Sequence, residues 1–444
     1  MKQVKNKINQ WLTGLSFAGL VVFSGASYSA PGLLEVYQMA AIHDSTLAQA
    51  RTELEADQQQ LVQARSLLLP KINAQAGFAY PDIERNQNRQ TLGLRLDQPL
   101  FNREAFSLFD EATIRTNLAQ MQYDTVVQNL MTRVSQAYFD LLLAQQTLSF
   151  AQSREAAEKI QWERAQAALE VGLASRTDVL QTRSAYDLAM ADRIEAKNNV
   201  DISQEALRRL TGQPVLQVQT LPLEQSIQPD ARLIREAEQA GLINEFSQNL
   251  AVQIAAEQQR LAEQGIITRK ADRWFDVNLS LSHTRTECGG SDRDPLLCRS
   301  GDNTEVSINA TLPLYQGGLT SSRIDEARLR SQTAMTAVRE AREQASLDTR
   351  VSLRNLERGQ ARVNALREAV KSNEAFLEAA EEGYRVGLRN LIDVVTARAN
   401  LFNAQNNLAQ AMQALVLEQL RLKQVLGQLH PDDLAQVDLL LAAP

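Results

Sequence analysis

The chain has 444 residues and a formal net charge of -7, and aromatic residues make up only 5% of it. So acidic a balance argues against nucleic acid as a partner. The 19 Gly and 11 Pro fall mostly between long uninterrupted segments rich in Ala, Gln, Leu, Arg and Glu. This composition is typical of long packed helices and argues against a simple set of compact globular domains.

The first 29 residues are predicted to be a secretory signal peptide. Three lysines precede an apolar run at 11–22, and small residues follow at 25–30. This order predicts cleavage after Ser29 or Ala30. A retained membrane anchor is the alternative, but the apolar run is shorter than the ~20 residues that a spanning helix needs. No cysteine directly follows the signal, so a lipid anchor is not expected there.

A β-hairpin is predicted near the start of the mature chain. Residues 33–69 have the periodicity of a helix, and from Ile72 the period changes from about 3.6 to 2. Apolar residues alternate with polar ones over 72–80 and again over 92–97, with a polar loop between the two runs. Two strands with one apolar and one polar face, joined by a hydrophilic loop, predict a hairpin at 72–97.

A very long helix is predicted after this hairpin. Asn102 can cap it, and the helical pattern continues to about Val171, which is roughly 70 residues or about 105 Å. A return helix at 176–210 is about half as long. It stops at Thr211-Gly212-Gln213-Pro214, and a connector at 215–230 leads into the second half of the chain.

The second half repeats every part of the first, so the sequence is a duplication. An entry helix is predicted at 231–270 and a β-hairpin at 275–312, and a second long helix is followed by a return helix that ends at 426–428. The predicted divisions are the signal peptide 1–29, the first structural repeat 30–214, the connector 215–230, the second structural repeat 231–428 and a C-terminal periplasmic segment 429–444.

Two matching stretches predict the tips of two helical hairpins. Val171-Gly172-Leu173 ends the first long helix, and Val386-Gly387-Leu388 ends the second. Gly supplies the positive φ that ends a helix, and Ser175 or Asn390, each followed by an acid three residues later, can cap the helix that follows.

The helices are predicted to pack through a coiled-coil seam. Apolar residues recur every seven positions along the second return helix, at Val394, Leu401, Leu408, Leu415 and Leu422. A sustained repeat of this kind forms such a seam. Small residues accompany the row, so the helices can approach closely, and we interpret the seam as structural core.

The four strands predict an oligomer. In a bilayer the two edges of a four-stranded sheet would leave N–H and C=O groups unpaired, at several kcal/mol each. Two chains would supply eight strands and a filled interior, whereas three would supply twelve and an open lumen, which the polar rows favour. Aromatic residues are expected at both membrane interfaces, Phe101, Trp274, Phe275 and Tyr315 at one and Phe78 and Tyr80 at the other.

Two runs identify a family. The chain resembles the TolC family of outer-membrane factors in its duplicated layout and in two runs of residues. These runs are Pro-Leu-Tyr-Gln-Gly-Gly-Leu-Thr-Ser-Ser at 313–322 and Val-Gly-Leu-Arg-Asn-Leu-Ile-Asp-Val-Val at 386–395. The resemblance covers nearly the whole mature chain. It implies a mainly α fold with a membrane β-barrel, in which a homotrimer forms a 12-stranded barrel in the outer membrane of a Gram-negative bacterium. The barrel continues as an α-helical tunnel into the periplasm.

The resemblance also implies a function and partners. Members of this family export substrates of inner-membrane ABC, RND or MFS transporters, through a periplasmic adaptor, in type I protein secretion or drug efflux. Because no lipidated cysteine is expected, the chain is more similar to TolC than to the lipid-anchored branch. Adaptor docking would involve the two tips, here Val171-Gly172-Leu173 and Val386-Gly387-Leu388.

A gate at the second tip is implied in the same way. Tyr384 and Arg389 do not recur in the first copy, which has Leu169 and Ala174 instead. In the family this Tyr and Arg close the periplasmic entrance through links to a Thr and an Asp of the first copy, here Thr177 and Asp178. Asp393 matches an acid that rings the constriction, whereas Thr396 replaces the second acid of that ring.

Cys288 and Cys298 are the two cysteines of the chain. They lie in the predicted loop of the second hairpin, between Thr284 and Asn303, which would face the cell exterior. After passage through an oxidising periplasm, we expect them to form a disulfide. Two free thiols are the alternative.

Catalysis is not expected. His43, His283 and His430 lie in different segments with no Cys or acid at metal-ligand spacing, and no phosphate loop or nucleophile motif is present. We therefore predict no enzyme activity, cofactor or metal, so that a partner must supply the energy for export. Two other classes remain open, a trimeric coiled-coil stalk or adhesin and a periplasmic adaptor without channel activity. A stalk needs no amphipathic strands, and the duplication counts against an adaptor.

Overall fold

A computed structural model describes residues 30–82, 87–225, 227–243, 246–289 and 299–441. The predicted signal peptide lies outside these residues. The unit that begins at Pro31 is mostly helical and contains one sheet. Its elements are α1 (Leu33–His43), α2 (Ser45–Ser66), β1 (Lys71–Asp82), β2 (Gln87–Phe101), α3 (Arg103–Glu170), α4 (Arg176–Thr211), α5 (Ala231–Ile243), α6 (Leu250–Ala271), β3 (Asp276–Gly289), β4 (Gly301–Thr311), α7 (Leu319–Arg385), α8 (Leu391–Val425) and α9 (Pro431–Leu441).

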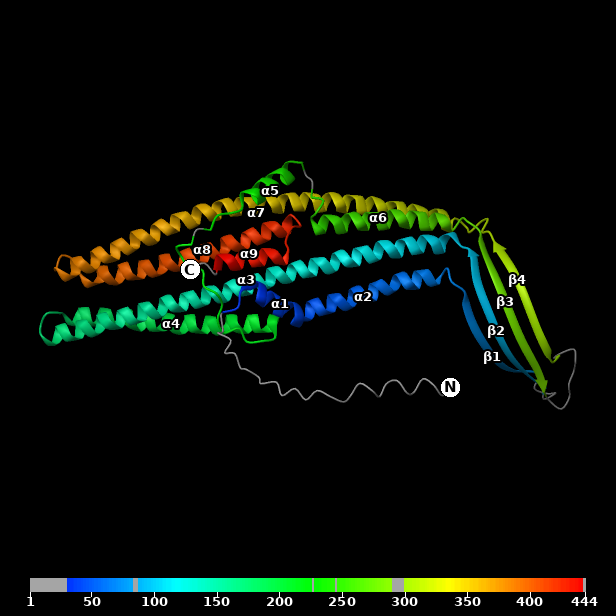
Figure 1. Cartoon of the computed structure of the whole chain (residues 1–444), viewed down its shortest axis with the longest axis horizontal. Coiled ribbons are helices and arrows are strands. Elements are labelled where there is room, and N and C mark those ends of the chain that lie inside the picture. Colours follow the sequence, from blue (N-terminus) through cyan, green and yellow to red (C-terminus); the bar gives the residue numbers. More distant parts are fainter. Residues whose placement is uncertain (1–29, 83–86, 226, 244–245, 290–298, 442–444) are drawn as a thin grey trace, which may run out of the picture. The chain divides into compact units, whose positions relative to one another are not determined.

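The order of elements repeats within the chain. The series α2-β1-β2-α3-α4 recurs as α6-β3-β4-α7-α8. The two longest helices, α3 with 68 residues and α7 with 67, each pack against an entry helix and a return helix (Figure 1). The strands adjoin one end of these long helices, and the turns to α4 and α8 lie at their other end.

Both entry segments are interrupted, so the prediction of one continuous helix in each was wrong. Asp44 takes an extended conformation between α1 and α2, and its side chain accepts a hydrogen bond from Leu47 N at 2.8 Å. Asn249 caps α6 by accepting from Val252 N at 3.0 Å. Both caps also have distant partners, since Asp44 pairs with Arg133 at 3.1 Å and Asn249 donates to the Val425 carbonyl at 2.6 Å. Tertiary contacts therefore fix these breaks.

The four strands form one antiparallel sheet in the order β1-β2-β3-β4. They extend further into the predicted loops than the alternation of apolar residues indicated. β2 begins at Gln87 rather than Leu92, and β3 continues to Gly289. Because β2 lies between β1 and β3, its backbone groups are paired on both sides, and polar side chains do not end the strand.

The sheet has one apolar and one polar face, as predicted. Ile72, Leu96, Leu281 and Val306 are aligned across the four strands, and Ile72 and Val306 are 71% and 66% exposed. The neighbouring row on the opposite face is Lys71, Asp97, Ser280 and Ser307. On this polar face Ser280 donates to Asp97 at 2.7 Å, and Arg95 Nε lies 2.9 Å from Asp97.

The seven-residue seam of α8 is buried. Val394, Leu408, Leu415 and Leu422 are at most 1% exposed, and Leu401 is partly buried against the core that contains Leu408. The largest fully buried side chains include Tyr138 and Phe139 of α3, at the level where α1 and the connector pack. Within the described residues, no helix is both long and apolar enough to cross a membrane.

Candidate functional site: the two hairpin tips

The two helical hairpins end in the same backbone turn. Gly172 has a φ of 74° and Gly387 a φ of 77°. The Leu173 N–H donates to the Ala168 carbonyl at 2.7 Å, and the Leu388 N–H donates to the Gly383 carbonyl at 2.8 Å. A Cβ added to either tip glycine would meet no atom within 4 Å, so the left-handed backbone alone requires glycine there.

Each tip presents apolar side chains to its surroundings. Val171 and Leu173 are 69% and 84% exposed on the first tip, and Val386 and Leu388 are 65% and 84% exposed on the second. Covering a pair of exposed apolar side chains with a partner removes apolar surface from water, which is favourable. The predicted docking residues are therefore available for contact with another molecule.

The caps of α4 and α8 differ, although both were predicted from the same pattern. Ser175 Oγ accepts from Asp178 N at 3.1 Å, and the Asp178 carboxylate accepts from the Ser175 N–H and hydroxyl at 2.8 Å each. The hydrogen bond from the Ser175 N–H, and to a smaller extent the one from the Ser175 hydroxyl, holds the pKa of the Asp178 carboxyl below its usual range. Asn390 likewise accepts from Asp393 N at 3.0 Å, but the Asp393 carboxylate lies 3.6 Å from Arg389 Nη1.

The predicted links between the two tips are not formed within one described chain. Thr177 and Asp178 lie at the start of α4, and no hydrogen bond or ion pair among the described residues connects them to Tyr384 or Arg389. Tyr384 is 43% exposed and lines a groove of about 610 Å³ between α3 and the second hairpin. Gln161, Arg164 and Ala168 of α3 form the other wall.

A buried charge cluster borders this groove, and sequence reasoning missed it. Glu158 of α3 is 1% exposed at its side chain, and Arg398 of α8 is 13% exposed. Arg398 Nη1 lies 3.9 Å from Glu158 Oε1, and Arg398 Nη2 lies 2.5 Å from Glu381 Oε1 on α7. Arg154 of α3 completes the cluster. One sequence signal existed, since Arg398 is four residues after Val394 of the buried seam and therefore lies on nearly the same helix face.

Cys288 is buried, with 5% of its surface exposed, and it is disulfide-bonded. Cys298 lies outside the described residues, so the pairing of these two cysteines stays a prediction. The described residues contain no group of three or more His, Cys, Asp or Glu side chains that could hold a metal ion.

Comparisons with known proteins agree with this architecture. A family model described as "Outer membrane efflux protein" matches residues 36–213 and 244–428, one stretch in each half of the chain. TolC of Escherichia coli is 30% identical over 98% of this chain and 89% of its own length. The protease secretion protein PrtF of Dickeya chrysanthemi is 25% identical over 93% and 92%.

Solved structures share the fold. The outer membrane protein VceC of Vibrio cholerae matches with a TM-score of 0.73 and 20% identity, over 89% of this chain and 96% of its own. The CmeC outer membrane channel of Campylobacter jejuni matches with a TM-score of 0.73 and 17% identity, over 92% and 89%. The chain therefore belongs to the outer membrane efflux protein family, and it is an outer-membrane efflux or type I secretion channel.

Proposed function

We propose that three copies of the chain form a homotrimer, whose twelve strands close a barrel in the outer membrane. The supporting observation is the open sheet, because β1 and β4 each have one strand partner within the described chain. Pairing of β4 with β1 of the next copy would satisfy both edges. The polar row that contains Asp97 would then face the lumen, and the apolar row that contains Ile72 would face lipid.

Aromatic side chains support the two membrane interfaces. Phe101 stacks on Phe275 at a centroid distance of 4.9 Å and lies 6.4 Å from Trp274, next to the helix ends. Phe78 packs against Tyr80 at 5.0 Å toward the loops. Aromatic residues are enriched at both faces of a bilayer, so these clusters fit the lower and upper rims of the barrel.

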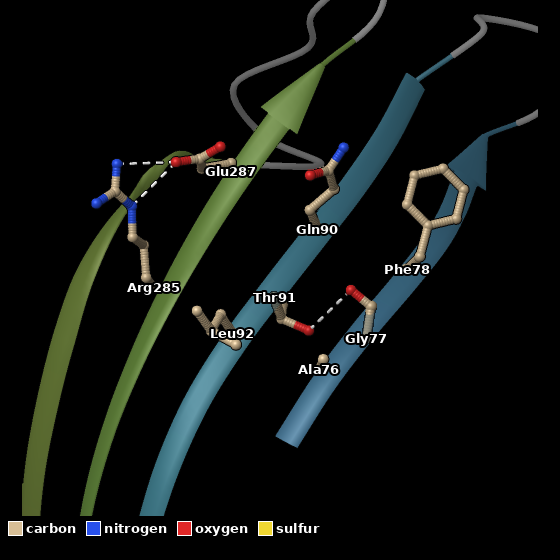
Figure 2. Close-up of a pocket in the computed structure, with 8 residues that line it drawn as sticks. All are labelled: Ala76, Gly77, Phe78, Gln90, Thr91, Leu92, Arg285 and Glu287. Atoms are coloured by element: carbon tan, nitrogen blue, oxygen red, sulfur yellow. Dashed lines mark hydrogen bonds and ion pairs between the residues drawn. The ribbon is translucent and has the colours of Figure 1, made fainter. Parts of the chain in front are cut away.

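The apolar face ends at a groove of about 660 Å³ near the loops, shown in Figure 2. Ala76, Phe78 and Leu92 line it together with Arg285, whose Nη2 lies 2.8 Å from Glu287 Oε1. From Phe275 to Arg285 the strand runs about 33 Å, or about 25 Å along the axis of a barrel whose strands tilt by ~40°. That length equals the ~25 Å apolar band of outer-membrane barrels, so we place the ion pair at the outer interface.

We propose that the helices continue this barrel as a periplasmic tunnel, with the tips as the docking point for an adaptor. The adaptor would connect the channel to an inner-membrane ABC, RND or MFS transporter. The exposed residues Leu173 and Leu388 support docking at the tips. Among the relatives, PrtF and AprF are named for protease secretion and BepC for efflux, so the class of exported substrate stays open between protein and small molecule.

We further propose that the second tip is the gate. Tyr384 and Arg389 would contact Thr177 and Asp178, within the protomer or between neighbours, and Asp393 would line the aperture. Arg389 is 52% exposed and bound only loosely to Asp393, so it is free to change partners when copies assemble. An exposed ion pair is worth about 0–1 kcal/mol, but three symmetric copies with added hydrogen bonds could stabilise the closed state by a few kcal/mol.

Light scattering tests the assembly. The detergent-extracted protein should be monodisperse, with a protein mass three times that of one mature chain. A monodisperse monomer or dimer would contradict the trimer. A stalk or adaptor of the same mass would not conduct ions, so recordings in planar bilayers separate the channel from both alternatives.

A further inference from the structure

Arg398 occupies a position between the two hairpins of one protomer. It lies on α8, and its guanidinium bonds Glu381 of α7 at 2.5 Å, so this contact stays within the second hairpin. Its other terminal nitrogen points to Glu158 of the first hairpin across 3.9 Å. Any movement of the second hairpin as a unit therefore changes the distance from Arg398 to Glu158 and preserves the bond to Glu381.

The contact between Glu158 and Arg398 is incomplete. At 3.9 Å the two atoms are too far apart for a hydrogen bond. Glu158 Oε2 and Arg398 Nη1 are both buried and have no hydrogen-bond partner among the described residues. A buried carboxylate that is not fully hydrogen-bonded within the protein is costly, and the cost rises steeply when its counter-charge is removed.

Arg154, the other cation that acts on Glu158, has partners of its own, although its buried Nε has no hydrogen-bond partner among the described residues. Arg154 Nη1 lies 2.7 Å from Asp192 of α4, and its guanidinium carbon lies 5.3 Å from the centroid of the Phe402 ring of α8. Burial raises the pKa of Glu158, and Arg398 and then Arg154 offset this only in part. The ionised carboxylate is thus under-compensated even with both arginines present.

We propose that Arg398 is a further gate residue, which compensates the buried Glu158 carboxylate and thereby sets how tightly the two hairpins of a protomer pack. This inference rests on the proposed gating at the tips. Arg398 shares α8 with Asp393, Arg389 lies in the tip turn just before α8, and Glu381 precedes Tyr384 by less than one turn of α7. Separation of the hairpins would let water reach Glu158, whereas close packing would shorten the pair to a direct hydrogen bond.

The two sides of the pair should respond differently to removal of charge. Arg398→Gln leaves the Glu158 carboxylate buried with only Arg154 nearby, so the hairpins should separate. Glu158→Gln removes the costly charge, and Arg398 keeps Glu381, so packing should stay the same or tighten. The double variant should therefore behave like the wild type, because Glu158→Gln removes the buried charge that Arg398→Gln leaves without its counter-charge.

Hydrogen–deuterium exchange of the full-length trimer measures this packing through the amides of 391–404. Arg398→Gln should speed their exchange by about tenfold or more, and the double variant should lie within about twofold of wild type. Exchange of the core segment 405–422 reports whether each variant is folded. Arg193→Gln is the matched control, since Arg193 pairs with Glu155 at 2.5 Å between α3 and α4 of the first hairpin only.

Three results would overturn the proposal. The double variant could exchange as fast as Arg398→Gln, which would show that Arg398 acts through packing alone. Arg193→Gln could loosen 391–404 as much as Arg398→Gln does. In single-channel recordings, Arg398→Gln could loosen the segment and leave conductance unchanged, which would separate hairpin packing from the gate. If wild-type trimers do not conduct at all, the proposed function fails, and the exchange data still decide the role of Arg398.

Discussion

Arg389 Nη1, in the turn just before α8, lies 3.6 Å from the carboxylate of Asp393 in the first turn of that helix. The equivalent positions of the first tip are Ala174 and Asp178. The Asp178 carboxylate instead accepts a hydrogen bond from the Ser175 N–H at 2.8 Å and completes a capping box. The same acid therefore stabilises a helix in the first copy and is available for other contacts in the second.

This difference predicts separate effects for the two acids. Asp178→Ala should lose the capping box and destabilise the start of α4 by about 0.5–1 kcal/mol, seen as faster exchange of its first amides. Asp393→Ala should leave the size of the opening unchanged and weaken cation selectivity, measured as the reversal potential in a salt gradient. Unchanged selectivity in Asp393→Ala would remove Asp393 from the ion pathway.

The packing of the hairpins should depend on pH through Glu158. Burial places its folded pKa above the unfolded value of about 4.3, so the ionised form opposes packing. This cost is fully present above the folded pKa and disappears as the pH falls below the unfolded value. The charged groups around it are Arg154, which is held by Asp192, and Arg398, which is held by Glu381.

Exchange of residues 391–404, corrected for the intrinsic pH dependence of the amides, should therefore slow as the pH falls from neutral toward the unfolded pKa of about 4.3. The effect should be larger in Arg398→Gln, because its Glu158 has lost a counter-charge. Glu158→Gln should show none of it. A pH response that persists in Glu158→Gln would assign the titration to another group.

Tyr138 is predicted to hold the middle of the bundle together. Its side chain is fully buried. Its hydroxyl donates a hydrogen bond to the Pro31 carbonyl at 3.2 Å and accepts one from Gln219 N at 3.1 Å. Tyr138→Phe should leave both backbone groups unpaired and lower the free energy of unfolding by about 1–3 kcal/mol per chain. Tyr186→Phe is the control, since the Tyr186 ring stacks on Trp162 at 5.5 Å. Equal shifts of the urea midpoint in both variants would contradict a role for the Tyr138 hydroxyl.

Cys288 and Cys298 are predicted to pair with each other. Alkylation without a reductant should modify neither cysteine, and alkylation after reduction should modify both. Mass spectrometry counts the modified sites. Closing so short a loop would add roughly 3 kcal/mol at most to local order. Complete alkylation without a reductant would show two free thiols.

Features set by local chemistry were predictable from the sequence. Gly172 and Gly387 have the expected positive φ, and Asn102, Ser175 and Asn390 cap the expected helices. Each depends on residues within one or two turns of it. The alternation from Ile72 and the heptads of α8 also gave the correct apolar faces, since periodicity follows directly from the geometry of strand and helix.

Features set by distant contacts were not predictable. Asp44, between α1 and α2, pairs with Arg133, and Asn249, which caps α6, donates to the Val425 carbonyl, so both caps have partners elsewhere in the fold. Glu158 looks like any other acid of α3, and its burial depends on packing against α8, more than 200 residues further along the chain. The ends of β2 depend on pairing with β3, which the pattern of β2 alone does not contain.

Single-channel recording of the wild type beside Tyr384→Phe/Arg389→Ser tests the gate most directly. We predict that the wild-type trimer conducts poorly and that the double variant conducts several-fold better, because it loses the links that close the second tip. Arg176→Ser, which removes an exposed arginine from the first tip, should conduct like wild type. A Tyr384→Phe/Arg389→Ser variant with wild-type conductance would show that the channel is not closed at this tip.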